Sequence, residues 1–409
     1  MDTHIARQPI FNSEEKIFGY ELLFRNGLDN AMPGEIDGDA ATSKLLSSSF
    51  FTIGIDTLTN GKYAFINFTQ KLITSRIPKL FPPSHTVIEV LEDVLASPDV
   101  IEALQSARKS GYTVALDDFI LTEETRPLLE AADIIKVDLL ATPLSDIDEL
   151  MEAAKDKKIT LLAEKVETPE VFLKAKEMGF SLFQGYFFCR PELISGKEIP
   201  ASTVTLLQLV AEVNRPKVDY DTLERLIARD LSLVHKLLSR LNSAWYGLKN
   251  PVHSLGEALH MVGIDEIRRL VGLVAMARIA SSAPEELVRT SLVRARLCEL
   301  IAQNSPLAPL APTLYALGLF SLLDALLAKP MDEILKDLPL PEVLTEALSN
   351  GAGPLMPFLD FVRAYEQGAW ADLTHAASRI KLPKERIATV LVDTLTWANT
   401  FSDLKPLAS

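Results

Sequence analysis

The sequence predicts a parallel α/β barrel followed by an all-α helical domain. Up to about residue 190, short β-branched and aromatic runs alternate with helical segments, as is typical of a parallel sheet. After about residue 200 the strand-like runs stop, and apolar residues recur three and four apart in Leu- and Ala-rich segments. No glycine-rich nucleotide-binding loop follows any of the runs. A closed barrel is therefore favoured, with an open doubly wound sheet as the alternative.

Seven apolar runs in the first half predict strands. In chain order they read IFGYELLF, YAFINF, TVIEVLE, TVALDDF, IIKVDLL, ITLLAEKVE and FSLFQGYFF. Helical segments such as SPDVIEALQSARKSGY and SDIDELMEAAKDKK lie between them. Barrel enzymes take their catalytic residues from the carboxyl ends of several strands, and these runs carry polar residues late in their length.

Acidic or amide residues lie late in these runs. A carboxylate in an apolar strand is costly to bury unless a cation pairs with it. We therefore expect a shared cationic partner at one end of the sheet, most simply a divalent metal. The set comprises Glu21, Asn67, Glu89, Asp117, Asp118, Asp138, Glu164, Glu167 and Gln184, with Lys136 as the one basic member.

The adjacent pair Asp117 and Asp118 is the strongest single indication of a metal. Mg²⁺ and Mn²⁺ prefer oxygen ligands, and two such ions stabilise both the attacking and the leaving oxygen of a phosphoryl displacement. Lys136 and Asp138 are two apart in one strand, so we expect them to point the same way. The other interpretation of any single acidic residue here is a helix cap or a turn.

Composition limits the class of protein. The chain has 409 residues, of which 48% are hydrophobic and 23% charged, which suits two globular domains. Its net charge of -14 argues against a nucleic-acid polymer as partner. Two cysteines, Cys189 and Cys298, give no disulfide framework, and no apolar run is long enough to span a membrane. We expect a cytoplasmic protein.

The second half is expected to be helical throughout. The change falls at CRPELISGKEIPAS, whose proline and glycine residues break regular structure, so the predicted domains are residues 1–195 and 200–409. Within the helical half, Arg268 and Arg269 are interpreted as a solvated helix face that could contact an acidic partner.

The first half resembles the EAL domains, a family of cyclic-di-GMP phosphodiesterases. RQPIFNSEEKIFGYELLFR holds their E-x-L-x-R pattern as Glu21, Leu23 and Arg25. The resemblance continues in order through FINFT, IEVLE, ALDDF, IKVD, AEKVE and FQGYFF, over residues 3–192. It implies a TIM-like (β/α) barrel that hydrolyses cyclic-di-GMP to linear pGpG with Mg²⁺ or Mn²⁺.

The resemblance also implies metal ligands and catalytic residues. Lys136 and Glu164 would position or deprotonate the attacking water. The implied ligands are Glu21, Asn67, Glu89 and Asp117 for one metal, with Asp118 and Glu167 for a second.

The remaining implied roles concern the substrate and a loop. Arg25 would hold a phosphate through its planar guanidinium group. Gln184 would complete the floor of the site, and Gln8 would lie near the ligand. Glu92 and Asp138 would support the loop that follows the paired aspartates.

That loop departs from the family pattern. Active members read D-D-F-G-T-G, whereas here Ile120, Leu121 and Thr122 replace the glycine-threonine-glycine. Glycine allows positive φ and close backbone approach, which isoleucine and leucine do not allow cheaply. Two further departures are Leu91 for a usual threonine and Lys165 for a usual glycine.

The second half resembles the HDOD domain, an output module related to HD phosphohydrolases. Where a catalytic relative carries its His-Asp dyad, this chain reads Leu322, Leu323 and Asp324. The order of the two domains resembles a bacterial class that joins EAL and HDOD on one chain. We expect a non-catalytic helical domain that binds a protein partner.

Three functions remain open from the sequence. The first is a metal-dependent phosphodiesterase of low or regulated activity, which the intact set of ligands favours. The second is an inactive cyclic-di-GMP receptor, which the altered loop favours, and the third is an interaction scaffold. A homodimer is left open.

Overall fold

The computed structural model describes residues 3–26, 54–142, 144–185, 187, 199–215, 220–243, 251–279, 284–336 and 338–399. The chain divides into two compact units. One comprises Met1–Arg190 with Ala364–Ala371, and the other Pro191–Arg363 with Asp372–Ser409. The domain bounds 1–195 and 200–409 stay a prediction, because the described residues leave out 188–198.

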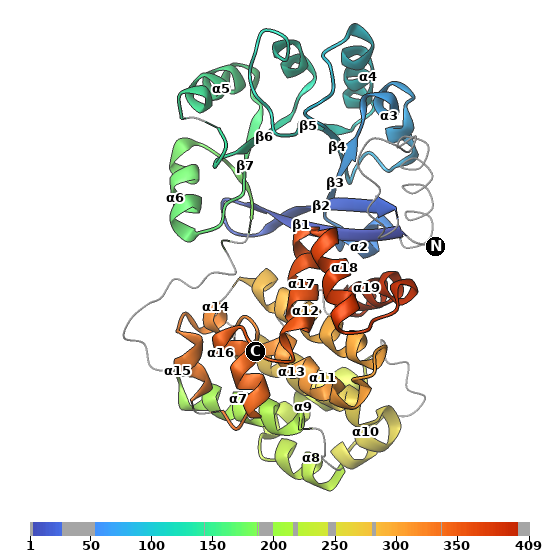
Figure 1. Ribbon diagram of the computed structural model, residues 1–409, viewed down its shortest axis with the longest axis vertical. Coiled ribbons are helices and arrows are strands. Elements are labelled where there is room, and N and C mark those ends of the chain that lie inside the picture. The colour runs from blue at the N-terminus through green and yellow to red at the C-terminus, as the bar shows by residue number, and fades with distance from the viewer. Residues whose placement is uncertain are drawn as a thin grey trace. The chain divides into compact units, whose positions relative to one another are not determined.

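The strands of the described residues close into a barrel in the order β1 to β8 (Figure 1). From β2 to β8, neighbouring strands run parallel. Their bounds are Thr3–Asn12 (β1), Ile17–Asn26 (β2), Tyr63–Phe68 (β3), Thr86–Val90 (β4), Thr113–Leu116 (β5), Ile134–Asp138 (β6), Thr160–Glu164 (β7) and Leu182–Gln184 (β8).

Helices link the parallel strands, and α3 to α6 lie outside the ring of strands (Figure 1). The predicted TIM-like barrel is therefore confirmed. The bounds are Ile55–Thr59 (α2), Gln70–Thr74 (α3), Ile77–Leu80 (η1), Pro98–Lys109 (α4), Arg126–Ala131 (η2), Leu144–Lys157 (α5) and Pro169–Met178 (α6).

The first strand runs against the others, which the sequence pattern did not indicate. β1 pairs antiparallel with β2 on one side and with β8 on the other. Only a short turn separates β1 from β2, and the Asn12 side chain accepts hydrogen bonds from the amides of Glu14 and Lys16, both at 3.0 Å. A parallel pair needs a long crossover, so this turn permits only a hairpin.

One apolar layer inside the barrel explains the position of the polar residues. It comprises Ile10, Phe65, Val87, Ala115, Ile134, Leu162 and Leu182. Because strand side chains alternate, the residue two places further along each parallel strand faces the same interior, one layer higher. Those residues are Asn67, Glu89, Asp117, Lys136, Glu164 and Gln184.

Strands β1 and β2 also place a polar residue two positions from a residue level with the apolar layer. On β1 the step runs backwards, from Ile10 to Gln8, because that strand is antiparallel. On β2 the step runs from Gly19 to Glu21, and a Cβ on Gly19 would lie 2.7 Å from the Tyr63 carbonyl oxygen. Glycine at this position thus lets β2 approach β3.

The second unit is helical in its described part, as predicted. The helices of the second half of the chain are Ala201–Val213 (α7), Tyr220–Ile227 (α8), Leu231–Leu241 (α9), Leu255–Val262 (α10), Ile264–Ile279 (α11), Glu285–Gln303 (α12), Ala308–Leu310 (η4), Ala311–Phe320 (α13), Leu323–Leu327 (α14), Met331–Leu335 (α15), Glu342–Asn350 (α16), Met356–Gln367 (α17), Trp370–Arg379 (α18) and Lys384–Asn399 (α19). Of these, the end of α17 and the start of α18, within Ala364–Ala371, belong to the first unit. In the described residues, no helix combines the length and the hydrophobicity needed to cross a membrane.

The interpretation of Arg268 and Arg269 as a solvated face is wrong. Arg268 is only 6% exposed and donates to the carbonyl oxygens of Val213 at 2.6 Å and Arg215 at 3.1 Å. Arg269 is largely buried and pairs with Glu299 at 2.9 Å. Both arginines join helices of the same unit instead of facing solvent.

Candidate active site

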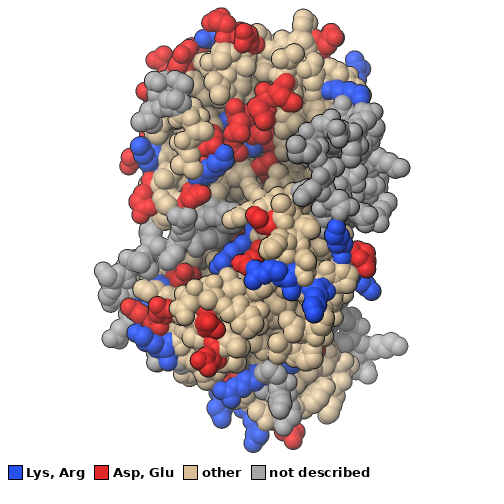
Figure 2. Space-filling model, in the orientation of Figure 1, with Lys and Arg blue, Asp and Glu red and all other residues tan. Residues whose placement is uncertain are grey.

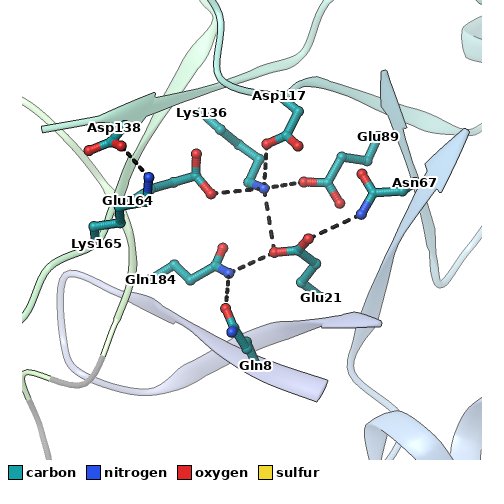
Figure 3. A network of polar contacts seen from close by, with 10 residues as sticks. All are labelled: Gln8, Glu21, Asn67, Glu89, Asp117, Lys136, Asp138, Glu164, Lys165 and Gln184. Carbon is teal, nitrogen blue, oxygen red and sulfur yellow. Dashed lines mark hydrogen bonds and ion pairs between the residues drawn. The ribbon is translucent and has the colours of Figure 1, made fainter. Parts of the chain in front are cut away.

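The Lys136 ammonium lies at the centre of the polar layer, where acidic side chains from four other strands converge (Figure 3). Its Nζ lies 2.7 Å from Asp117 Oδ1, 3.0 Å from Glu164 Oε1 and 3.5 Å from Glu21 Oε2, and it also contacts Glu89. Lys136 is 1% exposed and Glu89 is fully buried. The structure therefore gathers five of the predicted residues around one point.

Amide side chains hold Glu21 in place from both sides. Its Oε1 accepts from Asn67 Nδ2 at 3.1 Å, and its Oε2 accepts from Gln184 Nε2 at 2.7 Å. Gln184 Nε2 also donates to Gln8 Oε1 at 2.8 Å, so the antiparallel first strand contributes to the site (Figure 3). These bonds link β1, β2, β3 and β8 across the barrel.

The chemistry of this layer fits a divalent cation. Asn67 Oδ1, Glu89 Oε2 and Gln184 Oε1 are buried oxygens without a hydrogen-bond partner in the described structure. Four carboxylates surround a single ammonium, so most of their charge is uncompensated. Oxygen-rich, strongly anionic sites of this kind suit Mg²⁺ and Mn²⁺.

The carboxylates are not already arranged as a metal cage. Among the described residues, no three acidic, histidine or cysteine side chains surround a common metal position. Lys136 Nζ occupies the point at which the oxygens converge (Figure 3). A divalent ion would compete with this ammonium for the same oxygens.

The pKa values reflect this imbalance. Burial raises the pKa of Glu164 to about 8, and burial also raises the pKa of Asp117 and, more strongly, that of Glu89. Burial disfavours ionisation of Glu21 too, but Lys136 and the two amides outweigh it and lower the Glu21 pKa. Burial would lower the pKa of Lys136, yet the surrounding carboxylates raise it well above its usual value. Without a further cation, the site retains protons.

Three of the other predicted residues are exposed. Asp118 follows β5, is exposed and has a φ of +42°, so it turns away from the buried layer. Glu167 is also exposed. The exposed Glu92 forms no hydrogen bond with the loop after Asp118 among the described residues. Arg25 lies in β2 opposite His4, and its side chain is outside the described part.

Asp138 is paired with a residue that the sequence had marked only as a departure from the family. Its Oδ1 accepts from the amides of Leu140 at 2.8 Å and Ala141 at 3.2 Å, and its Oδ2 contacts Lys165 Nζ. Burial alone would raise the Asp138 pKa, but these bonds outweigh it and lower the pKa. Spacing within a strand could not reveal Lys165, because the contact joins two strands.

The loop after Asp118 has a conformation that needs no glycine. Ile120, Leu121 and Thr122 all avoid positive φ. The Thr125 hydroxyl donates to the Ile120 carbonyl at 2.7 Å and accepts from the Thr122 amide at 2.9 Å. The two threonines thus brace the loop from within.

A glycine fixes the last member of the layer. Gly185 has a φ of +147°, and a Cβ there would lie 2.0 Å from the Val166 carbonyl oxygen. The Val166 amide donates to the Gln184 carbonyl at 3.0 Å. Only glycine lets β8 approach the segment after β7 so closely and so hold Gln184 in the ring.

Figure 2 shows Asp and Glu side chains gathered over the middle of the barrel unit. Asp118 and Glu167, which follow β5 and β7 in the chain, are exposed. The candidate site is therefore an anionic centre that reaches the surface. It can bind cations, and through them it can bind an anionic substrate.

Comparisons with known proteins agree with this arrangement. The EAL domain family matches residues 45–191, and the HDOD domain family matches residues 199–330. The protein named cyclic di-GMP phosphodiesterase CdgJ from Vibrio cholerae is 34% identical over 98% of this chain and 94% of its own. The uncharacterized protein YuxH from Bacillus subtilis is 34% identical over 99% of this chain and 100% of its own.

A solved structure also aligns with the barrel. It is an EAL domain protein from Listeria monocytogenes, which is 23% identical over 46% of this chain and 88% of its own, with a TM-score of 0.39.

Proposed function

This chain belongs to the family of proteins that join an EAL domain to an HDOD domain, and from this premise we propose that it is a metal-dependent cyclic-di-GMP phosphodiesterase. It would hydrolyse the cyclic dinucleotide to linear pGpG, with Mg²⁺ or Mn²⁺ as cofactor. The full-length similarity to CdgJ supports the substrate. The observation that carries the proposal is the ring of four carboxylates and two amides around Lys136.

The proposal gives the buried residues two tasks. A bound divalent ion neutralises charge on the phosphate and activates water. The proposed ligands for it are Glu21, Asn67, Glu89 and Asp117, with Asp118 and Glu167 for a second ion.

Side chains of the protein would then orient and deprotonate the attacking water. Glu164 is the proposed acceptor of its proton, because burial raises the pKa of this carboxyl to about 8 and makes it a stronger base. Lys136 would orient the water and offset developing negative charge. Arg25 would bind a phosphate, Gln184 would complete the floor of the site, and Gln8 would lie near the ligand.

Turnover of cyclic-di-GMP by the purified full chain tests the proposal. With Mn²⁺ we expect pGpG to form, and with a chelator we expect none. Glu21→Ala should lower the rate by more than about 100-fold, since even indirect supports of a metal site are worth 10–100-fold. Glu130→Gln is the control, because Glu130 lies in η2, before β6, and pairs with Lys157 at 2.5 Å. No turnover at saturating metal in a folded sample would contradict catalysis.

The altered loop favours a second candidate, a receptor that binds cyclic-di-GMP without cleaving it. Ile120 in this loop is 60% exposed, and the loop is braced by its own threonines. Calorimetry that shows binding with intact ligand recovered would favour the receptor. Absence of binding, with and without metal, would exclude both functions.

The helical domain is proposed to bind a protein partner. Buried arginine–glutamate pairs hold its helices together, and Leu231, Met261 and Val343 are its exposed large apolar side chains, together with Tyr220, in the described residues. The proposal is tested by asking whether a protein partner co-purifies with the full chain. Replacement of these exposed side chains by polar ones should abolish that co-purification.

A further inference from the structure

Lys165 is the first residue after β7, and its ammonium contacts the carboxylate of Asp138 at the end of β6 (Figure 3). The Asp138 side chain is 8% exposed and the Lys165 side chain 57% exposed. The other oxygen of Asp138 holds the amides of Leu140 and Ala141. The pair therefore joins the segments after two neighbouring strands at the edge of the acidic site.

The backbone at Lys165 is the kind that favours glycine. Its φ is +54°, in the left-handed region that side chains with a Cβ adopt reluctantly. Glycine would take this conformation without strain. What lysine adds is a positive charge, which it places against Asp138.

This charge lies on the outer side of the site. Asp118 and Glu164 are also near enough for their charges to act on the Lys165 ammonium. The buried ring already holds one ammonium, that of Lys136. Lys165 is thus a second cation at this end of the barrel, and its charge interacts with Asp118, one of the two exposed residues proposed for the second divalent ion.

Resting on the proposed function, we propose that Lys165 is a built-in cation that competes with the second divalent ion. Two positive charges near the same carboxylates repel each other, so Lys165 weakens the second ion at Asp118 and Glu167. The ring residues proposed for the first ion lie on the far side of the Glu164 carboxylate from Lys165 (Figure 3), so an ion held there would be affected less. The activity of this chain would then depend chiefly on one tightly bound ion.

Calorimetric titration of the metal-free full chain with Mn²⁺ alone tests this inference. Lys165→Gly relieves the backbone strain while removing the charge, so the variant is expected to fold. Lys165→Gly should bind the second Mn²⁺ ion roughly tenfold more tightly than the wild type does, and its affinity for the first ion should be unchanged. Lys165→Arg keeps the charge and should match the wild type.

Lys158→Gly is the matched control. Lys158 is also an exposed lysine with positive φ, at +57°, but it precedes β7 and so lies at the opposite end of that strand. Its loss should leave both affinities unchanged. If the wild type binds no Mn²⁺, the proposed function fails. If it binds Mn²⁺ but Lys165→Gly does not tighten a second ion, or Lys158→Gly does so equally, the role of Lys165 is overturned.

Discussion

Each unit buries a cluster of charges, and the two clusters differ in balance. In the helical unit, Glu299 accepts from Arg269 at 2.9 Å and Arg296 at 2.6 Å, and Arg269 also pairs with Glu266 at 2.9 Å. Two arginines thus face two glutamates. In the barrel, the Lys136 ammonium alone faces four carboxylates.

The difference separates a structural cluster from a functional one. A balanced and hydrogen-bonded ion network can stay buried without any addition, and removing one partner is what destabilises it. An unbalanced cluster must take up protons or another cation, so its state depends on the solution. Strongly shifted pKa values beside such a cluster are typical of binding and catalytic sites.

Removal of one cation from each cluster is expected to have the largest effect, and its dependence on Mn²⁺ should distinguish the two clusters. Lys136→Met and Arg269→Met should each lower the free energy of unfolding of the metal-free protein by about 3–5 kcal/mol, because buried carboxylates lose their partner. Saturating Mn²⁺ should restore most of the loss in Lys136→Met only. Urea unfolding with and without Mn²⁺ measures both, and equal recovery of the two variants would erase the distinction.

The pH dependence of the free energy of unfolding should sharpen the difference between the two clusters. The folded-state pKa of Glu164 is about 8, above its usual 4.5, so the folded metal-free protein holds this proton more tightly than the unfolded chain does. The free energy of unfolding should therefore fall as the pH rises from about 4.5 to about 8, by up to about 1.4 kcal/mol per pH unit.

Glu164→Gln should reduce this slope without abolishing it, because burial also raises the pKa values of Asp117 and Glu89. Urea unfolding in chelator at several pH values measures the change. Glu102→Gln, at an exposed position of α4, is the control and should keep the slope. A slope in Glu164→Gln as steep as that of the wild type would contradict the assignment.

A single balanced pair gives the smallest expected effect. Asp230 caps α9 by accepting from the Leu233 amide at 3.0 Å, and it pairs with Arg278 at 2.6 Å. Asp230→Ala should cost about 1–2 kcal/mol, the usual worth of such a cap.

The stability that Asp230 contributes should change with pH in the opposite direction to that contributed by Glu164 in the barrel. Burial would raise the Asp230 pKa, but the amide and Arg278 outweigh it and lower the pKa. Its contribution is therefore present above the usual pKa of 3.8 and is lost as the pH falls below it. Mn²⁺ should not change the result in thermal or urea unfolding, and a metal-dependent loss would contradict the structural role.

The barrel and most of its polar ring could be predicted because both depend on local patterns. A carboxylate two residues beyond an apolar core position, as at Glu89 and Asp117, follows from strand alternation alone. The direction of β1 could not be predicted, since it depends on the short turn at Asn12. Long-range pairing also escaped the sequence: Arg268 binds the Val213 carbonyl, 55 residues away, and Lys165 reaches across to Asp138.

The antiparallel first strand has a consequence for synthesis. β1 and β2 can form their hairpin as soon as they leave the ribosome, but the other edge of β1 pairs only with β8, where Ile10 lies opposite Gln184. Throughout the translation of everything between them, that edge has no strand partner, and such edges invite pairing with other chains. Glu21 meanwhile lacks the amide of Gln184, so the nascent barrel gains its complete ring only with its last strand.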